Sequence, residues 1–168
     1  MSKDIDTLNE LIDKIRNGEL EGSLEITVKN KGKVNRILVQ SNKNEPDAEI
    51  AEQVHKIQLD KPELKDVNFS RVNLTGSNFS GILFRNVNFS YARFEYSNLA
   101  STDLSDVNFY KASLSRTDMS NAYGVHIGGA YVTGSVNFYN TNFSNNNQSS
   151  GINPLDANRM QENSNFVY

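Results

Sequence analysis

The sequence has no cysteine, only two histidines and no long apolar run. Without cysteine, disulfide bonds and thiolate metal sites are excluded. No apolar stretch approaches the roughly 18 residues that a membrane-spanning helix needs. The opening MSKDIDTLNE also lacks the apolar segment of a signal peptide. These absences predict a cytoplasmic protein that does not cross a membrane.

The chain also lacks a strong charge of either sign, since its net charge is −3 over 168 residues. Nothing in that balance predicts direct nucleic-acid binding. The two histidines, His55 and His126, lie in different regions, so a His/Cys zinc site cannot be assembled. We therefore expect no metal and no cofactor.

What the sequence does have is an apolar residue at every fifth position through its middle. The register holds for twelve consecutive positions, and the position two before each is small or β-branched. A period of five fits neither an α-helix nor an ordinary strand. The register consists of Leu64, Phe69, Leu74, Phe79, Phe84, Phe89, Phe94, Leu99, Leu104, Phe109, Leu114 and Met119.

A period of twenty lies inside the period of five, because Val-Asn-Phe begins at Val67, Val87 and Val107. Four units per twenty residues predict a closed, four-sided coil in which each residue stacks over the one twenty positions earlier, about 4.8 Å away. One unit cannot bury its apolar side chain alone, but stacked units build a continuous core. The aromatic members of the predicted core columns are Phe69, Phe89, Phe109, Phe84, Phe94 and Phe79.

The pattern resembles the pentapeptide-repeat family, whose consensus reads Ala-(Asp/Asn)-Leu-x-x. Close matches are VNFSR at 67–71, SNLAS at 97–101 and TDLSD at 102–106. The resemblance covers about 57–145. It implies a mainly β fold, a right-handed quadrilateral parallel β-helix of about four coils.

The register breaks after Met119, because the next two positions hold glycine. Val-Asn-Phe returns at Val136, 29 residues after its third copy and thus nine more than one coil. We therefore expect an insertion loop at about 123–135, whose glycines let the chain leave and rejoin the wall. A tolerated bulge is one interpretation and a recognition surface the other. The candidate recognition residues in this loop are Tyr123, His126 and Tyr131.

Residues 1–56 have the pattern of a small α-β-β-α unit. Apolar residues at helical spacing precede two alternating segments around a Lys31-Gly32 turn, and Asp47 then starts a second short helix. The apolar face of that helix would consist of Ile50, Val54 and Ile57. Such a unit either caps the open first coil, whose edge would attract strand addition, or forms a homodimer.

Residues 146–168 begin as a low-complexity linker and end in an apolar tail. The tail closes the last coil, pairs with a second subunit or stays disordered, and the sequence does not choose.

Outward positions of the repeat carry residue types that are enriched in protein interfaces. Three of them stand twenty residues apart and share one predicted corner column, and a fourth replaces the usual Asn, Asp or Ser. An ordinary mixed surface is the alternative. The candidate protein-binding residues are Arg71, Tyr91, Lys111 and Arg93.

The repeat offers little for catalysis. Asp66, Asn86 and Asp106 share one outward column, and the two carboxylates would stand about 10 Å apart. We interpret them as a solvated column, because no nucleophile–base pair and no cleft accompany them. We expect the protein not to be an enzyme.

The resemblance suggests one function and the charge of the chain suggests another. The best-known family members protect DNA gyrase from quinolones by imitating DNA, which needs a strongly negative surface. Residues 57–145 carry seven acidic and seven basic residues, which disfavours that role. We therefore expect a non-catalytic scaffold in the bacterial cytoplasm, presenting a rigid surface to a protein partner. The DNA-mimicking, gyrase-binding protein is the alternative.

Overall fold

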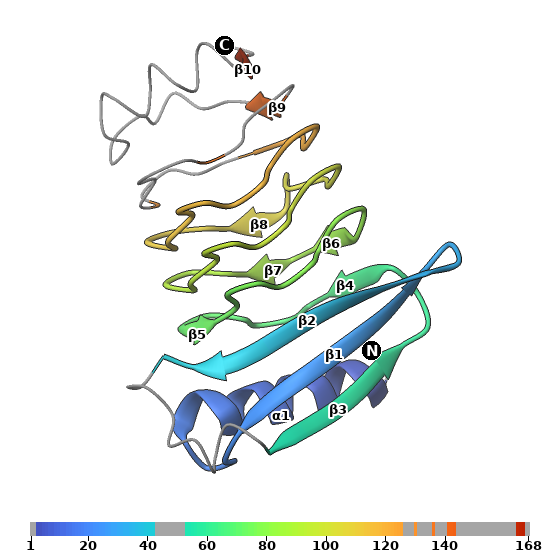
Figure 1. Cartoon of the computed structure of the whole chain (residues 1–168), viewed down its shortest axis with the longest axis vertical. Helices are drawn as coiled ribbons and strands as arrows, with labels where there is room; N and C mark the ends of the chain where they lie inside the picture. Colours follow the sequence, from blue (N-terminus) through green and yellow to red (C-terminus); the bar gives the residue numbers. More distant parts are fainter. Residues whose placement is uncertain are drawn as a thin grey trace.

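The computed structural model describes residues 3–42, 53–125, 130, 136, 141–143 and 164–166. A helix and a small sheet form one end, and short strands are stacked above them (Figure 1). The elements are α1 (Lys3–Asn17), β1 (Ser23–Asn30), β2 (Lys33–Ser41), β3 (Val54–Leu59), β4 (Glu63–Lys65), β5 (Val72–Asn73), β6 (Leu83–Arg85), β7 (Val87–Asn88), β8 (Val107–Asn108), β9 (Thr141–Phe143) and β10 (Ser164–Phe166).

Helix α1 has acidic residues in its first turn and basic residues in its last, as the helix dipole favours. It ends at Gly18, whose φ of 74° is the left-handed conformation common just beyond a helix. Leu8, Ile12 and Ile15 lie on one face at helical spacing and are fully buried. That face packs into the same core as the apolar side of the sheet.

Strands β1 and β2 form an antiparallel hairpin in which Ile26 lies opposite Ile37. Lys31 and Gly32 both have positive φ at the turn, as a tight hairpin turn requires. The sheet order is β3-β1-β2-β5, so its last strand belongs to the repeat. The buried apolar side chains of the β1–β2 hairpin are Leu24, Ile26, Val28, Ile37 and Val39.

The second helix that we predicted in the N-terminal unit is wrong where the structure describes it. Val54 and Ile57 lie in β3, which pairs in parallel with β1, with Ile57 beside Ile26. Alternate residues of β3 are exposed, so the segment follows a period of two rather than a helical one. β3 also runs across the boundary expected at 56/57, while Asp47 and Ile50 lie outside the described residues.

From residue 62 onwards, the chain pairs in parallel with itself at intervals of twenty residues. We call the segments 62–81, 82–101 and 102–121 the first, second and third tiers. Each tier meets the next at four places, so four outward columns run through the stack (Figure 1). The parallel pairs include Glu63–Leu83–Asp103, Asn68–Asn88–Asn108, Asn73–Arg93–Ser113 and Asn78–Asn98–Asp118.

The core of the tiers is made of the fifth-position side chains. The ring of Phe89 stacks on Phe69 at 5.3 Å and on Phe109 at 5.5 Å, with interplanar angles of 16° and 15°. This is the aromatic column predicted from the period of twenty. Phe94 approaches the ring of Phe89 edge-on at 4.8 Å, which ties neighbouring columns together. The whole register from Leu64 to Met119 is buried.

Asn and Asp recur one position before most core residues, where they form the same local hydrogen bond. The Oδ1 atom of Asn88 accepts from the backbone N–H of Ser90 at 2.9 Å, and Asn68 and Asn98 do the same two residues on. Such a bond stabilises a turn from within. Most corners of the tiers are therefore supported by the Asn or Asp side chain two residues earlier.

The N-terminal unit is hydrogen-bonded to the first tier. β2 pairs with β5 through Gln40–Asn73 and Ser41–Val72, and further along β2 the carbonyl of Arg36 accepts from the N–H of Asn78 at 2.8 Å. From α1, the guanidinium of Arg16 donates to the carbonyls of Ser70 and Asn68. Backbone groups on the lower edge of the first tier thus find partners in residues 3–42.

Replacing Asn9 with alanine is expected to destabilise this junction by about 0.5–1.5 kcal/mol, because two backbone groups of the first tier lose their hydrogen-bond partner. The Nδ2 atom of Asn9 donates to Asp66 O at 2.8 Å, and its Oδ1 accepts from Asn68 N at 2.9 Å. Urea unfolding measures the loss. Asn17→Ala, at the exposed end of the same helix, is the matched control. Equal effects of the two substitutions would contradict the assigned role of Asn9.

The tiers continue slightly further than the five-residue register predicted. Ala122 is buried, and Tyr123 pairs with Asp103 exactly one tier below in sequence, through a backbone bond from its N–H to Thr102 O at 3.0 Å. Near the C-terminus, β10 pairs in parallel with β9, with Phe166 beside Phe143. Of the three alternatives for the tail, the described part therefore pairs within the chain.

Candidate protein-binding surface

The corners of the tiers project their side chains from left-handed backbone. Tyr91 has a φ of 59° and Lys111 one of 55°, values that residues other than glycine rarely adopt. Stacked corners therefore hold columns of outward side chains. The non-glycine residues with positive φ in the tiers are Asp66, Arg71, Asn86, Tyr91, Tyr96, Ser101, Lys111, Arg116 and Asn121.

One corner column combines aromatic rings with cations. The guanidinium of Arg71 lies over the ring of Tyr91, 4.3 Å from its centroid. The ammonium of Lys111 lies 5.8 Å from Tyr91 and 5.6 Å from Tyr110, and the two rings meet edge-to-face at 5.9 Å. Cation–π contacts of this length attract through the ring quadrupole. The sequence-predicted residues Arg71, Tyr91 and Lys111 are thus brought together.

Arg93, the fourth predicted residue, lies in the outward column that follows this corner. Its position is taken by a turn-supporting Asn or Asp in most units, so the corner geometry does not explain an arginine there. Its Nε atom lies 3.4 Å from Oε2 of Glu95, while Ser113 donates to Oε1 of the same carboxylate at 2.9 Å. Arg93 thus forms an ion pair with Glu95 on the surface of its column.

The next corner repeats the combination. The guanidinium of Arg116 lies 5.2 Å from the ring centroid of Tyr96 and donates to its hydroxyl oxygen. Tyr96 is 63% exposed. The two corners flank the Arg93 column along the chain, so all these residues belong to one side of the tiers. We call this side the Arg–Tyr face; it consists of Arg71, Tyr91, Arg93, Tyr96, Tyr110, Lys111 and Arg116.

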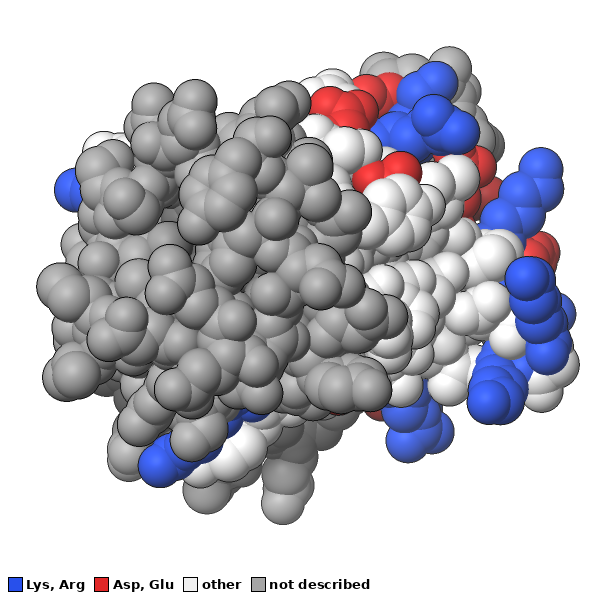
Figure 2. All heavy atoms as spheres, turned by 90° about the horizontal axis from the view of Figure 1, so that it is seen from above, with Lys and Arg blue, Asp and Glu red and all other residues white. Residues whose placement is uncertain are grey.

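The charges of the described repeat are divided between this face and the rest of the surface. The Arg–Tyr face carries four cations and one carboxylate, Glu95. The remaining charged residues of 60–118 are six carboxylates and three cations. A view along the stack shows side chains of both signs around its described rim (Figure 2). The balanced net charge of the repeat therefore conceals a positive side. The carboxylates outside the face are Asp60, Glu63, Asp66, Asp103, Asp106 and Asp118.

The residues of the Asp66, Asn86 and Asp106 column, on another corner, are hydrogen-bonded to one another. The side-chain amide of Asn86 donates to Asp66 Oδ1 at 2.8 Å, and its backbone N–H donates to Asp106 Oδ2 at 2.7 Å. Asn86 thus links the two carboxylates across three tiers. This arrangement matches a structural column and offers no free acid–base pair.

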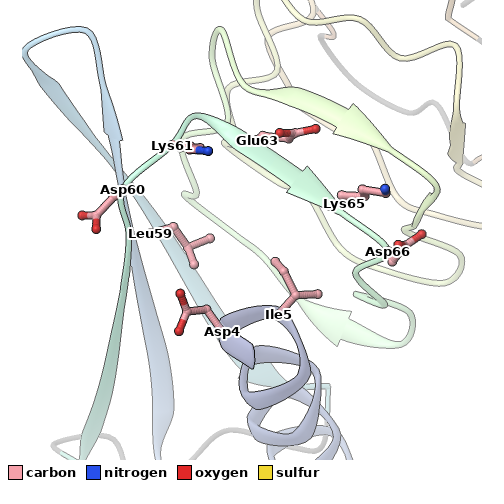
Figure 3. A pocket seen from close by; sticks show the side chains of 8 residues that line it. All are labelled: Asp4, Ile5, Leu59, Asp60, Lys61, Glu63, Lys65 and Asp66. Carbon is pink, nitrogen blue, oxygen red and sulfur yellow. The ribbon is translucent and has the colours of Figure 1, made fainter. Parts of the chain in front are cut away.

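A cleft of about 470 Å³ lies between the start of α1, the end of β3 and strand β4 (Figure 3). Its lining mixes carboxylates and lysines, with Ile5 and Leu59 as its apolar members. Hydrogen bonding from Gln58, together with Lys29 close by, lowers the pKa of the Asp60 carboxyl below its ordinary 3.8. In the described part of the chain, no cluster of His, Asp or Glu is arranged to hold a metal ion. The lining residues are Asp4, Ile5, Leu59, Asp60, Lys61, Glu63, Lys65 and Asp66.

Comparison with known proteins identifies the repeats. Residues 63–95 and 88–123 match the family described as pentapeptide repeats, in eight copies. This part of the chain consists of pentapeptide repeats. Among solved structures, it is similar to a pentapeptide repeat protein from the thylakoid lumen of Arabidopsis thaliana, with 19% identity and a TM-score of 0.26 over 64% of this chain and 80% of that one. The comparison with curated proteins gives no match.

The structure describes the predicted loop only at 123–125 and at Ala130, which is buried. Tyr123 is 52% exposed, beside Gly124 with a φ of 66°. His126 and Tyr131 lie outside the described residues, so their role stays a prediction. His55, the other histidine, lies in β3 with its Nε2 atom 2.9 Å from Glu21 O. Among the residues described, no helix is both long and apolar enough to cross a membrane.

The sequence identifies Tyr96 and Tyr110 as outward residues without assigning them to a site, and Arg116 is absent from our list of candidates. The signal for Arg116 is its distance of twenty residues from Tyr96, the same period that stacks the core. Applied to outward positions, that period groups cations with the tyrosines one tier below. The pentapeptide repeat therefore specifies its surface columns by the same rule as its core.

Proposed function

We propose that this protein is a non-catalytic scaffold that presents a rigid surface to a protein partner. The tiers would form the right-handed quadrilateral β-helix of about four coils that the repeat implies, with residues 1–56 as a cap on its first coil. The hydrogen bonds of α1 and β2 to the first tier support a cap over a dimerisation unit. We place the protein in the cytoplasm.

The observation that carries this proposal is the Arg–Tyr face. Most of its side chains are exposed, and cation–π contacts and the Arg93–Glu95 pair connect several of them to neighbouring side chains. Tyrosine and arginine dominate the energetics of protein interfaces, and side chains that are already ordered lose little entropy on binding. Behind them lies a core of stacked rings, so the backbone under the face is stiff.

The proposal is tested by affinity capture from the native lysate with the full chain as bait. The Tyr91→Ala, Tyr110→Ala double variant should recover at least roughly tenfold less of any specific partner, since interface aromatics often contribute 2 kcal/mol or more. Tyr123→Ala, a comparably exposed tyrosine at the loop, is the matched control. If partner recovery depends on Tyr123 instead, the loop is the binding surface. If no protein is recovered in a way that depends on either site, the scaffold proposal fails.

The DNA-mimicking alternative is weaker, because it needs a continuous negative surface. One side of the described repeat is positive, and Asn86 interrupts the Asp66–Asp106 column. A gyrase supercoiling assay, with and without a quinolone, separates the two functions. Inhibition or protection at sub-stoichiometric amounts of this protein would establish the alternative.

A further inference from the structure

We propose that the Arg–Tyr face binds an acidic segment of the partner protein. This inference rests on the proposed scaffold function and adds the chemistry of the partner. It starts from two cations that have no carboxylate beside them: among the described residues, no ion pair involves Arg71 or Lys111. Their charge is directed instead at the ring of Tyr91, from two sides.

Electrostatic complementarity selects the sign of the partner. The face carries four cations against one carboxylate, and Arg93 already occupies that carboxylate. An acidic segment would meet Arg71, Lys111 and Arg116, whose charges act over about one Debye length, roughly 8–10 Å at physiological ionic strength. A basic segment would be repelled, which gives the face specificity as well as affinity.

The geometry of the tyrosines favours a protein over a nucleic acid. Single-stranded nucleic acids bind proteins largely by stacking their bases on the open faces of aromatic side chains. Arg71 already covers one face of Tyr91, Lys111 approaches the same ring, and the Tyr110 ring meets it edge-to-face. Arg116 likewise covers Tyr96. The rings therefore present edges and hydroxyl groups, which suit backbone and side-chain contacts.

The sheet beneath the face extends the surface available to such a segment. β2 pairs with β5, and Asn73 of β5 pairs in turn with Arg93, which pairs with Ser113. Gln40, Asn73, Arg93 and Ser113 therefore follow one another across adjacent strands. Asn42, just beyond β2, donates to the carbonyl of Tyr91 at 3.5 Å. A bound segment can thus continue from the tiers onto the N-terminal sheet without crossing a gap in the strands.

The test is a selection of displayed random peptides against the immobilised full chain. Sequences rich in Asp and Glu should be enriched, and a fluorescein-labelled peptide of the enriched sequence should bind in an anisotropy titration. Arg71→Glu with Lys111→Glu should weaken that binding by roughly tenfold or more, because two attractive contacts become repulsive. Raising the salt concentration should weaken binding of the unaltered protein.

Lys61→Glu with Lys65→Glu is the matched control, since it makes the same change in net charge at two exposed lysines outside the face. It should leave the affinity within about twofold, because neither lysine belongs to the face and salt screens exposed charges that are not in contact. Thermal melts of both double variants establish that they are folded.

The other outcomes overturn the inference in distinguishable ways. Peptides that bind equally well to the Arg71→Glu, Lys111→Glu variant, or that are not acidic, keep the scaffold function but remove the acidic partner from this face. Tighter binding of a labelled 20-nucleotide single-stranded DNA than of any peptide, lost in the same variant, would make the face a nucleic-acid site. No enrichment of any peptide would count against the scaffold function as well.

Discussion

Phe89→Ala should destabilise the protein by about 3–5 kcal/mol, the range measured for deletion of a buried aromatic ring. Phe89 is fully buried at the centre of the aromatic core. Its ring stacks between Phe69 and Phe109 and also meets Phe94 edge-on. Removing it opens a cavity that touches three tiers at once, and rigid backbone on each side hinders collapse into the space. Denaturant unfolding monitored by circular dichroism measures the change.

Phe89→Leu is the control for this prediction, because leucine fills the equivalent position in other units, such as Leu74, Leu99 and Leu104. It should cost less than about 1.5 kcal/mol, as swaps that roughly conserve volume do. If alanine and leucine cost the same, the stacked column does not contribute as described. If alanine costs less than about 1 kcal/mol, the site relaxes and the core is not close-packed.

Gly22→Ala should cost about 2–4 kcal/mol, combining a strained left-handed residue with overpacking against backbone. Gly22 has a φ of 90°, and an added Cβ would lie 2.1 Å from the carbonyl oxygen of Gln53. That oxygen accepts the bond from Ser23 N that begins the β1–β3 pairing. The methyl group therefore forces apart the two strands at their first contact. Thermal unfolding measures the loss.

Gly32→Ala separates the two causes. Gly32 also has a positive φ, 81°, but an added Cβ would meet nothing within 4 Å. Only the conformational part remains, about 1 kcal/mol. A loss at Gly32 as large as that at Gly22 would show that backbone conformation accounts for everything and that the contact with Gln53 is relieved by a small shift.

The stacking of the tiers was accessible from the sequence because two periods specify it together. The period of five separates inward from outward residues, and the period of twenty pairs them between tiers. Phe69, Phe89 and Phe109 satisfy both periods and stack. Each local choice agrees with the global arrangement in this part of the chain, which is why pattern alone sufficed.

The second N-terminal helix failed for the opposite reason. In a short segment, Val54 and Ile57 fit helical spacing, while Ile57 and Leu59 fit a strand equally well. Pairing with β1 favours the strand over the helix, and the edge of β1 that pairs in parallel with β3 exists only in the folded unit. The Arg–Tyr face was predicted only in part. The net charge of zero for residues 57–145 gives the number of charged residues but not their positions on the surface. Assigning each cation to its column reveals the positive side.

At the left-handed corners, a favourable backbone conformation and a surface side chain are competing requirements, because glycine meets the first and only other residues meet the second. A chain built only for an easy fold would have glycine at every such bend, as it does at Gly76 and Gly81. Where Arg71, Tyr91 and Arg116 occupy the bend instead, the left-handed backbone conformation is less favourable than it is for glycine, and the surface gains a side chain at a defined tier. At each such corner, a residue other than glycine therefore makes the backbone conformation less favourable and adds a side chain to the surface, and successive side chains of one column are one tier apart.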